Sequence, residues 1–211
     1  MNRALSLALL APLALSVAAA APAQPAAQPT AQLAQVSQHL RAVDTMTADF
    51  VQTDRAGKAL TGQLSLKRPG RVRFQYQKGV PLLVVGDGKA LTMIDYQVRQ
   101  VSRWPIGDSP LAVLLDPSKD ISRFAKIVPS GNPNLLLVAA RDPKHPEFGT
   151  TTIGFLRNPA APGGLTLQGW SVVDAQNNRS AVQLSNQRFN TPISDRTFRW
   201  DDPRPRRAPG R

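Results

Sequence analysis

Polar and apolar residues alternate one by one along residues 60–76, and this period of two constrains the fold more than any other feature of the chain. Successive side chains of a β-strand point to opposite faces, so such a series puts one face against a core and the other in water. The inward members of the series are Leu60, Gly62, Leu64 and Leu66, followed after a turn by Val72, Phe74 and Tyr76. The segment therefore predicts two antiparallel strands joined by a turn at residues 67–70.

The same signals continue along most of the chain. Short period-two or apolar runs alternate with turn sequences rich in Gly, Asp, Asn and Pro, as in strands linked by hairpins. Residues 121–128 fit a helix or a strand equally well. The further predicted strands begin at Thr47 and then cover residues 82–85, 91–96, 98–104, 135–141, 150–156, 165–174, 180–189 and 196–200. Together they predict a mainly β chain of about eleven strands in one continuous antiparallel meander.

Two segments are predicted to be helical. Apolar residues recur at helical spacing at Leu33, Val36, Leu40, Val43 and Met46. This spacing predicts an amphipathic helix over residues 32–45, with His39 on its polar side. A second, short helix is predicted over residues 111–115, where Ser109 supplies an N-cap and Pro110 the first helical position. Both helices have apolar surface that must cover something.

A large curved sheet has a concave side that is filled by side chains, covered by helices or occupied by a ligand. The first two arrangements give an ordinary core, and the third gives a carrier. Composition and periodicity leave these arrangements open.

The two ends of the chain differ in composition from the middle. A basic start, an apolar stretch over residues 4–21 and an A-x-A sequence predict a signal peptide that is cleaved after Ala23. An uncleaved membrane anchor is the alternative. With cleavage, the mature protein is expected to be soluble outside the cytoplasm. The expected organisation is a signal peptide over 1–23, a Pro/Ala/Gln linker over 24–31, one domain over 32–200 and a basic Pro/Arg tail over 201–211.

The residue inventory argues against most enzyme chemistry. The chain has no cysteine, which excludes disulfides, thiolate metal sites, a cysteine nucleophile and a lipid anchor on an N-terminal cysteine. It has only two histidines, His39 and His145, and a single glutamate, Glu147. No nucleophile lies beside a base at a catalytic spacing. We therefore expect neither an enzyme nor a bound cofactor or metal ion.

The formal net charge is +12, and the basic stretch around Arg71 and Arg73 lies close to aromatic residues. That combination is also found in nucleic-acid-binding proteins. On a strand, however, the two arginines point away from Phe74 and Tyr76, so the charges and rings do not share one surface. We expect no nucleic-acid partner, and we expect these arginines on a solvated outer face.

Five motifs follow one another in an informative order and spacing. They are MTADFVQ (46–52), GQLSLKRP (62–69), LVVGDGK (83–89), SPL (109–111) and NRS (178–180). Together with Phe198, and behind a signal peptide, they resemble the periplasmic outer-membrane lipoprotein carrier family (LolA) over roughly residues 33–200. The related outer-membrane receptor is itself a lipoprotein and would need a cysteine, which this chain lacks.

The resemblance implies an incomplete, open antiparallel β-barrel whose helices form a lid over an apolar cavity. It also implies a latch between the barrel and this lid. The arginine of the KRP turn, here Arg68, is implied to donate hydrogen bonds to main-chain carbonyls of the lid. By position, the lid residues are Leu40 in the first helix and Leu114 and Leu115 in the second. A guanidinium has five donors in a planar fork, which suits several carbonyls at once.

The resemblance also implies a ligand and its partners. The ligand is the acyl part of lipoproteins, which the protein would collect from an inner-membrane lipoprotein-releasing ABC transporter and deliver, as a monomer, to an outer-membrane lipoprotein receptor. Each candidate for the cavity wall could equally be a plain core residue. These candidates are Met46, Phe50, Leu64, Leu66, Val72, Phe74 and Val84. The alternative function is a paralogous lipid- or glycolipid-binding protein, or an envelope lipid sensor, on the same fold.

Overall fold

The computed structural model describes residues 29–105, 115–118, 121–123, 125–141, 146 and 149–205. The predicted signal peptide, residues 24–28 of the linker, Leu114 and His145 lie outside these ranges. Within them, no helix has the length and apolar character needed to cross a membrane.

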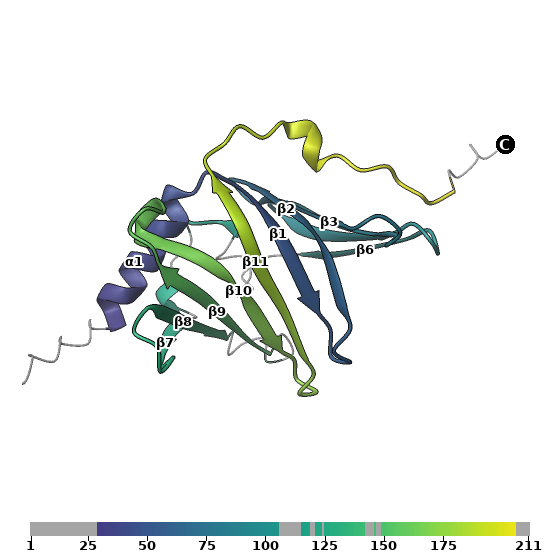
Figure 1. Ribbon diagram of the computed structural model, residues 1–211. Helices are drawn as coiled ribbons and strands as arrows, with labels where there is room; N and C mark the ends of the chain where they lie inside the picture. The colour runs from purple at the N-terminus through teal and green to yellow at the C-terminus, as the bar shows by residue number, and fades with distance from the viewer. Residues whose placement is uncertain are drawn as a thin grey trace, which may run out of the picture.

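Eleven strands form a single antiparallel sheet, as the alternating pattern predicts (Figure 1). The strands are β1 (Thr45–Thr53), β2 (Ala59–Lys67), β3 (Arg71–Tyr76), β4 (Leu82–Asp87), β5 (Ala90–Asp95), β6 (Gln100–Pro105), β7 (Ala125–Val128), β8 (Leu135–Arg141), β9 (Thr150–Arg157), β10 (Leu165–Val173) and β11 (Arg179–Phe189).

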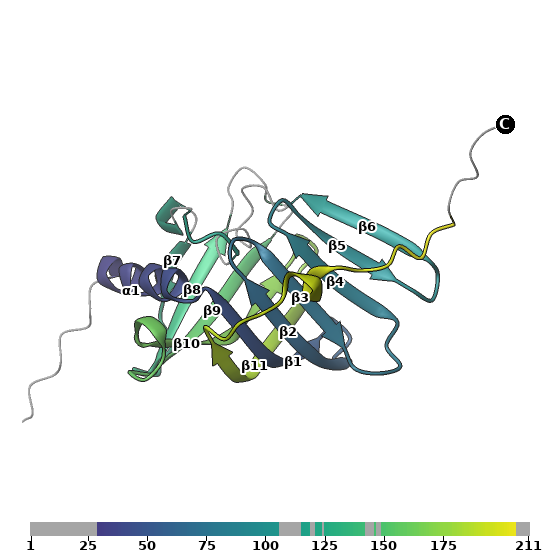
Figure 2. The same cartoon turned by 90° about the horizontal axis from the view of Figure 1, so that it is seen from above.

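The sheet is two meanders joined by the pairing of β1 with β11, so the predicted single continuous meander is wrong in this respect. Its order is β6-β5-β4-β3-β2-β1-β11-β10-β9-β8-β7, which places β6 and β7 at opposite edges. The sheet bends strongly and does not close between these edges (Figure 2). The fold is therefore the predicted open barrel, with its opening between β6 and β7.

Two segments differ from the sequence prediction. Residues 196–200 do not form a strand, because Asp195–Phe198 is a 3₁₀ helix (η4) capped by the side chain of Ser194. The ambiguous segment 121–128 divides into a 3₁₀ helix, η1 (Ile121–Arg123), and strand β7. The total of eleven strands is thus correct, but the predicted strand at residues 196–200 is not formed, and β7 is the eleventh strand instead.

Two bulges bend the long central strands. The register of β1 against β11 shifts between Thr47 and Asp49, beside Asn186, whose φ of 53° lies in the left-handed region. The register of β10 against β9 shifts between Leu167 and Gly169. An extra residue on one strand bends it and increases its twist, which gives the sheet its concave face.

The helix α1 (Pro29–Ala42) begins and ends three residues before its predicted limits. Pro29 fits the first helical position, because its missing N–H needs no partner there. Asn190, from the far end of the chain, fixes the other terminus: its side chain accepts from the N–H of Asp44 at 2.9 Å and donates to the carbonyl of Ala42 at 2.9 Å. Val43 therefore lies just after the helix, and it is buried there by contacts with the rest of the fold.

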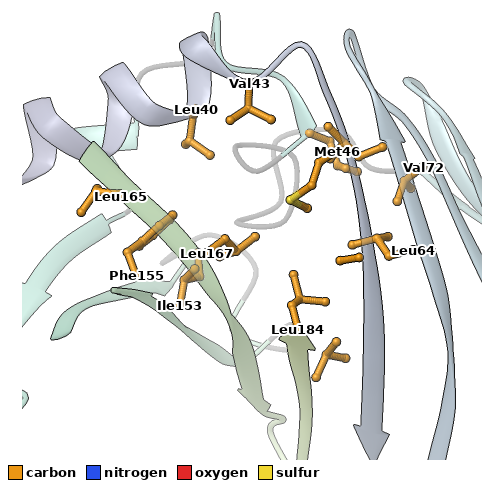
Figure 3. Packing of buried hydrophobic residues seen from close by; sticks show 14 of the residues in the cluster. Leu40, Val43, Met46, Leu64, Val72, Ile153, Phe155, Leu165, Leu167 and Leu184 are labelled. Carbon is orange, nitrogen blue, oxygen red and sulfur yellow. The ribbon is translucent and has the colours of Figure 1, made fainter. Parts of the chain in front are cut away.

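The main core lies between α1 and the concave face of the sheet. Figure 3 shows Leu40 and Val43 pointing down from the lid, with Met46, Leu64 and Val72 on one side and Phe155, Leu165 and Leu167 on the other. This arrangement confirms the apolar face predicted for the first helix.

A second, smaller core lies on the outer face of the sheet. Leu83, Val85 and Ile94 point away from the concave side and are covered by Phe198 and Trp200 of the C-terminal segment. This segment crosses β3 and β4 (Figure 2).

The basic outer face of β3 holds the C-terminal segment in place. Arg73 donates to the carbonyls of Thr197 and Arg199 at 3.2 and 2.9 Å. Arg71 pairs with Asp195 at 2.6 Å. Both arginines thus lie on the outer face as expected, but this face is partly covered by the chain's own C-terminal segment and is not fully solvated.

The lid helix also packs against the 3₁₀ turn η3 (Pro162–Gly164) between β9 and β10. Gly163 has a φ of 64°, and a Cβ placed on it would lie 2.6 Å from the Cα of His39. Only a residue without a side chain lets the helix approach this closely.

We expect Gly163→Ala to destabilise the protein more than Gly131→Ala does. Both glycines have left-handed φ values, but a Cβ on Gly131 meets nothing within 4 Å. The Gly131 variant should lose about 1–2 kcal/mol from backbone strain, and the Gly163 variant about 1–3 kcal/mol more from overpacking against α1. Urea unfolding monitored by circular dichroism measures both. Equal losses would contradict the close helix packing.

Candidate functional site

An apolar cavity of about 290 Å³ lies beneath α1, on the concave side of the sheet. Six of the seven predicted wall residues line it, and two of the three predicted lid residues, Leu40 and Leu115, line it as well. The six wall residues are Met46, Leu64, Leu66, Val72, Phe74 and Val84. Their contact with a lipid stays a prediction.

Phe50 is buried beside the cavity and is not part of its wall. Its ring stands edge-on to Phe74 at 5.3 Å and to Tyr76 at 5.2 Å. Gly62, opposite Phe50 on β2, leaves room for this ring, since a Cβ there would lie 2.7 Å from it. Phe50 therefore supports the wall from behind.

Other wall residues were not predicted. They are chiefly Leu91, Met93, Leu167, Trp170 and Val182. The cross-strand register would have identified some of them, because Met93 stands opposite Val84 and Trp170 opposite Val182, and directly opposed residues share a face. Register is not visible in a single sequence, which shows only the parity within each strand.

Arg68 connects the barrel to the lid. Its Nε donates to the carbonyl oxygen of Val43 at 3.2 Å, just beyond the end of α1, and its backbone N–H donates to the carbonyl of Asp44 at 2.8 Å. Burial lowers the pKa of the Arg68 guanidinium to about 10, while the nearby carboxylates of Asp116 and Asp44 act in the opposite direction. The partly buried guanidinium thus bonds a carbonyl beside α1, and its action as a latch stays a prediction.

The KRPG turn and the DGK hairpin lie against each other. A Cβ on Gly70 would be 2.2 Å from the Cα of Gly88, and the backbone N–H of Gly70 donates to the carbonyl of Leu115 at 3.0 Å. Asp87 accepts hydrogen bonds from the backbone of the DGK hairpin and pairs with Arg103 at 2.7 Å. Two separate sequence motifs thus form one support for Arg68 and Leu115.

His39 lies in the cavity wall, and its predicted place on the polar side of the helix is wrong. It is 2% exposed, and its Nδ1 donates to the carbonyl of Pro162 at 2.6 Å. Its ring stands edge-on to Phe155 and Phe189. Burial lowers the pKa of His39, the Pro162 carbonyl opposes this, and the Arg68 charge adds to the lowering. Because His39 follows Val36 by three residues, helical geometry places it beside the apolar stripe, a signal that its polarity obscured.

Three polar side chains lie together at the end of the cavity away from α1. Gln52, Tyr76 and Ser180 line it there, and the Tyr76 hydroxyl donates to Oε1 of Gln52 at 2.6 Å. Burial raises the pKa of Tyr76, so its hydroxyl is a donor at neutral pH. The rest of the wall between this group and the lid is apolar.

In the described ranges, no three His, Asp or Glu side chains come close enough to hold a metal ion. The arrangement there is one of apolar walls with a few directed polar groups, which suits binding of an apolar ligand.

A family model described as "Outer membrane lipoprotein carrier protein LolA" matches residues 41–201. An outer-membrane lipoprotein carrier protein from Chromobacterium violaceum is 32% identical over 200 residues, which cover 90% of this chain and 91% of the relative. A second protein of that name, from Dechloromonas aromatica, is 25% identical over 180 residues, covering 80% and 83% of the two chains.

Among solved structures, an uncharacterized conserved protein from Thermus thermophilus superposes with a TM-score of 0.49 at 12% identity. The superposition covers 82% of this chain and 93% of that one.

The lowered pKa of His39 predicts that the protein loses stability as the pH falls. Above about pH 6.5, the ordinary pKa of histidine, His39 is neutral in the folded and the unfolded protein, so its titration does not reduce the free energy of unfolding. Below that pH the unfolded chain binds a proton that the native state binds more weakly, so the free energy of unfolding decreases down to the native pKa. Urea unfolding between pH 7.5 and 5.5 should show this slope.

Replacing His39 by Gln should reduce the slope whatever it does to the absolute stability. The His145→Gln variant keeps His39 and should retain the slope that His39 contributes. An unchanged slope in His39→Gln would contradict the assignment.

Proposed function

The chain belongs to the outer-membrane lipoprotein carrier family, and on this premise we propose that it is a periplasmic chaperone that takes the acyl chains of lipoproteins into its cavity and carries them from the inner to the outer membrane. The observation that supports this most directly is the apolar cavity of about 290 Å³ under α1, with the partly buried Arg68 bonded to the carbonyl that follows this helix. The family description names a carrier, which agrees with a function in binding and not in catalysis.

The proposed partners follow from the family and not from any surface of the molecule. Lipoproteins would be handed over by an inner-membrane lipoprotein-releasing ABC transporter and passed to an outer-membrane lipoprotein receptor. Periplasmic location requires export, for which the signal peptide predicted over residues 1–23 would serve.

A carrier has to bind strongly and still release its cargo. Burying acyl chain is worth about 0.8 kcal/mol per methylene, so one long chain alone contributes on the order of 10 kcal/mol. We propose that closure of the lid competes with the cargo. When Leu40, Val43 and Leu115 fill the space under α1, the Arg68 bond to Val43 is made, and cargo entry has to break these contacts.

Arg68→Leu should hold lipoprotein longer and deliver it about tenfold more slowly. The variant loses charge-assisted hydrogen bonds worth about 1.5–3 kcal/mol each, which favour only the closed lid. The measurement loads the mature protein from spheroplasts containing a labelled triacylated lipoprotein and follows transfer to outer-membrane vesicles.

Arg71→Leu is the matched control, because Arg71 lies three residues away on the outer face and pairs with Asp195. It should load and deliver as the wild type does. Normal delivery by Arg68→Leu would contradict the latch. If the folded wild-type protein releases no lipoprotein but binds a fluorescent fatty acid, a paralogue with another lipid cargo is the better description.

A further inference from the structure

Gln52 is a polar residue at an inward position of an otherwise apolar strand face. Met46, Ala48 and Phe50 precede it on the same face of β1, and all three are buried. Gln52 stands opposite Val182 of β11, and Val182 stands opposite Trp170 of β10, so the three form one row across the sheet. Gln52 is only partly buried, so its polar side chain can meet a polar group of a ligand at this end of the cavity.

Tyr76 fixes how the Gln52 amide is presented. Its hydroxyl donates to Oε1, so the Nε2 side of the amide carries two N–H donors directed away from that bond. Among the described residues, Nε2 has no acceptor within hydrogen-bond distance. Ser180 lies on the same face of β11 as Val182 and adds a hydroxyl donor at this end of the cavity. The end away from α1 thus holds donors with capacity for a ligand.

Two donors at the lid end are bonded to carbonyls of the protein itself. Arg68 donates to the Val43 carbonyl, and His39 donates to the Pro162 carbonyl. An acyl chain of a lipoprotein or glycerolipid begins at an ester or amide carbonyl, an acceptor that is costly to bury without a donor. Among the described wall residues, the Gln52 amide at the far end keeps N–H donors that no protein acceptor occupies, so it can meet that carbonyl.

We propose that Gln52, oriented by Tyr76 and assisted by Ser180, is the subsite that binds the ester or amide carbonyl at the head of the bound acyl chain. The inference rests on the proposed function and deepens it. Gln52 lies six positions after Met46 on β1, a distance of about 20 Å along the strand. The chain therefore lies with its carbonyl at Gln52 and its methyl end under Leu40 and Val43, where it displaces the lid.

Trp170 provides the measurement, because it lines the cavity in the same row as Gln52. The chain has three tryptophans, so Trp104→Phe with Trp200→Phe leaves Trp170 as the one indole. In this background, brominated lipids that enter the cavity quench its fluorescence. Titration with a brominated palmitic acid methyl ester and with 1-bromohexadecane compares the same chain with and without a carbonyl.

Gln52→Leu should weaken binding of the ester about five- to tenfold and leave bromohexadecane binding unchanged or stronger. Tyr76→Phe, which frees the amide to rotate, should give a smaller loss for the ester alone. The control is Gln63→Leu, a matched change on the exposed outer side of β2, which should bind both lipids like the wild type. Thermal unfolding verifies that each variant is folded.

The position of the bromine tests the orientation of the chain. Bromine next to the ester carbonyl should quench Trp170 more than bromine at the methyl end, and the reverse order would overturn the proposal. Equal ester affinity in Gln52→Leu and Gln63→Leu would overturn the subsite while leaving the carrier function intact. A wild-type protein that binds neither lipid would overturn both.

Discussion

The antiparallel pairing of β1 with β11 is the interaction on which the rest of the structure depends. It joins two meanders from the two halves of the chain into one sheet, and it moves the opening of the barrel to the gap between β6 and β7. It also brings Asn190 to the end of α1, where it caps the helix. Without this pairing, neither the concave face nor its lid would be assembled.

Polar contacts, and not apolar packing alone, determine where the lid helix lies. Apolar burial is non-directional and would allow α1 to slide over the concave face. Its position is fixed by His39 at Pro162, by Arg68 at Val43 and by the close approach of Gly163. Few directed bonds in an apolar setting give a lid with a defined closed state that can still open, as an exchangeable ligand requires.

The two faces of the sheet are used in different ways. The outer face of β3 and β4 is occupied by the C-terminal segment through Arg73, Phe198 and Trp200. β4 is therefore buried on both sides, with Val84 towards the cavity and Leu83 towards the C-terminal segment. Fixing this half of the sheet from outside leaves the concave side free to serve as the binding surface.

The sequence alone determined the mainly β class, the number of strands and the parity of the wall, because a period of two specifies which side chains share a face within a strand. It also pointed to Arg68, through a short motif. The tertiary structure decided what pairs with what: the β1–β11 closure, the end of α1 at Ala42, the place of Phe50 behind the wall and the burial of His39. Those features depend on contacts between residues more than a hundred positions apart, or on packing of aromatic rings across strands. The local sequence pattern does not show which distant residues will come into contact.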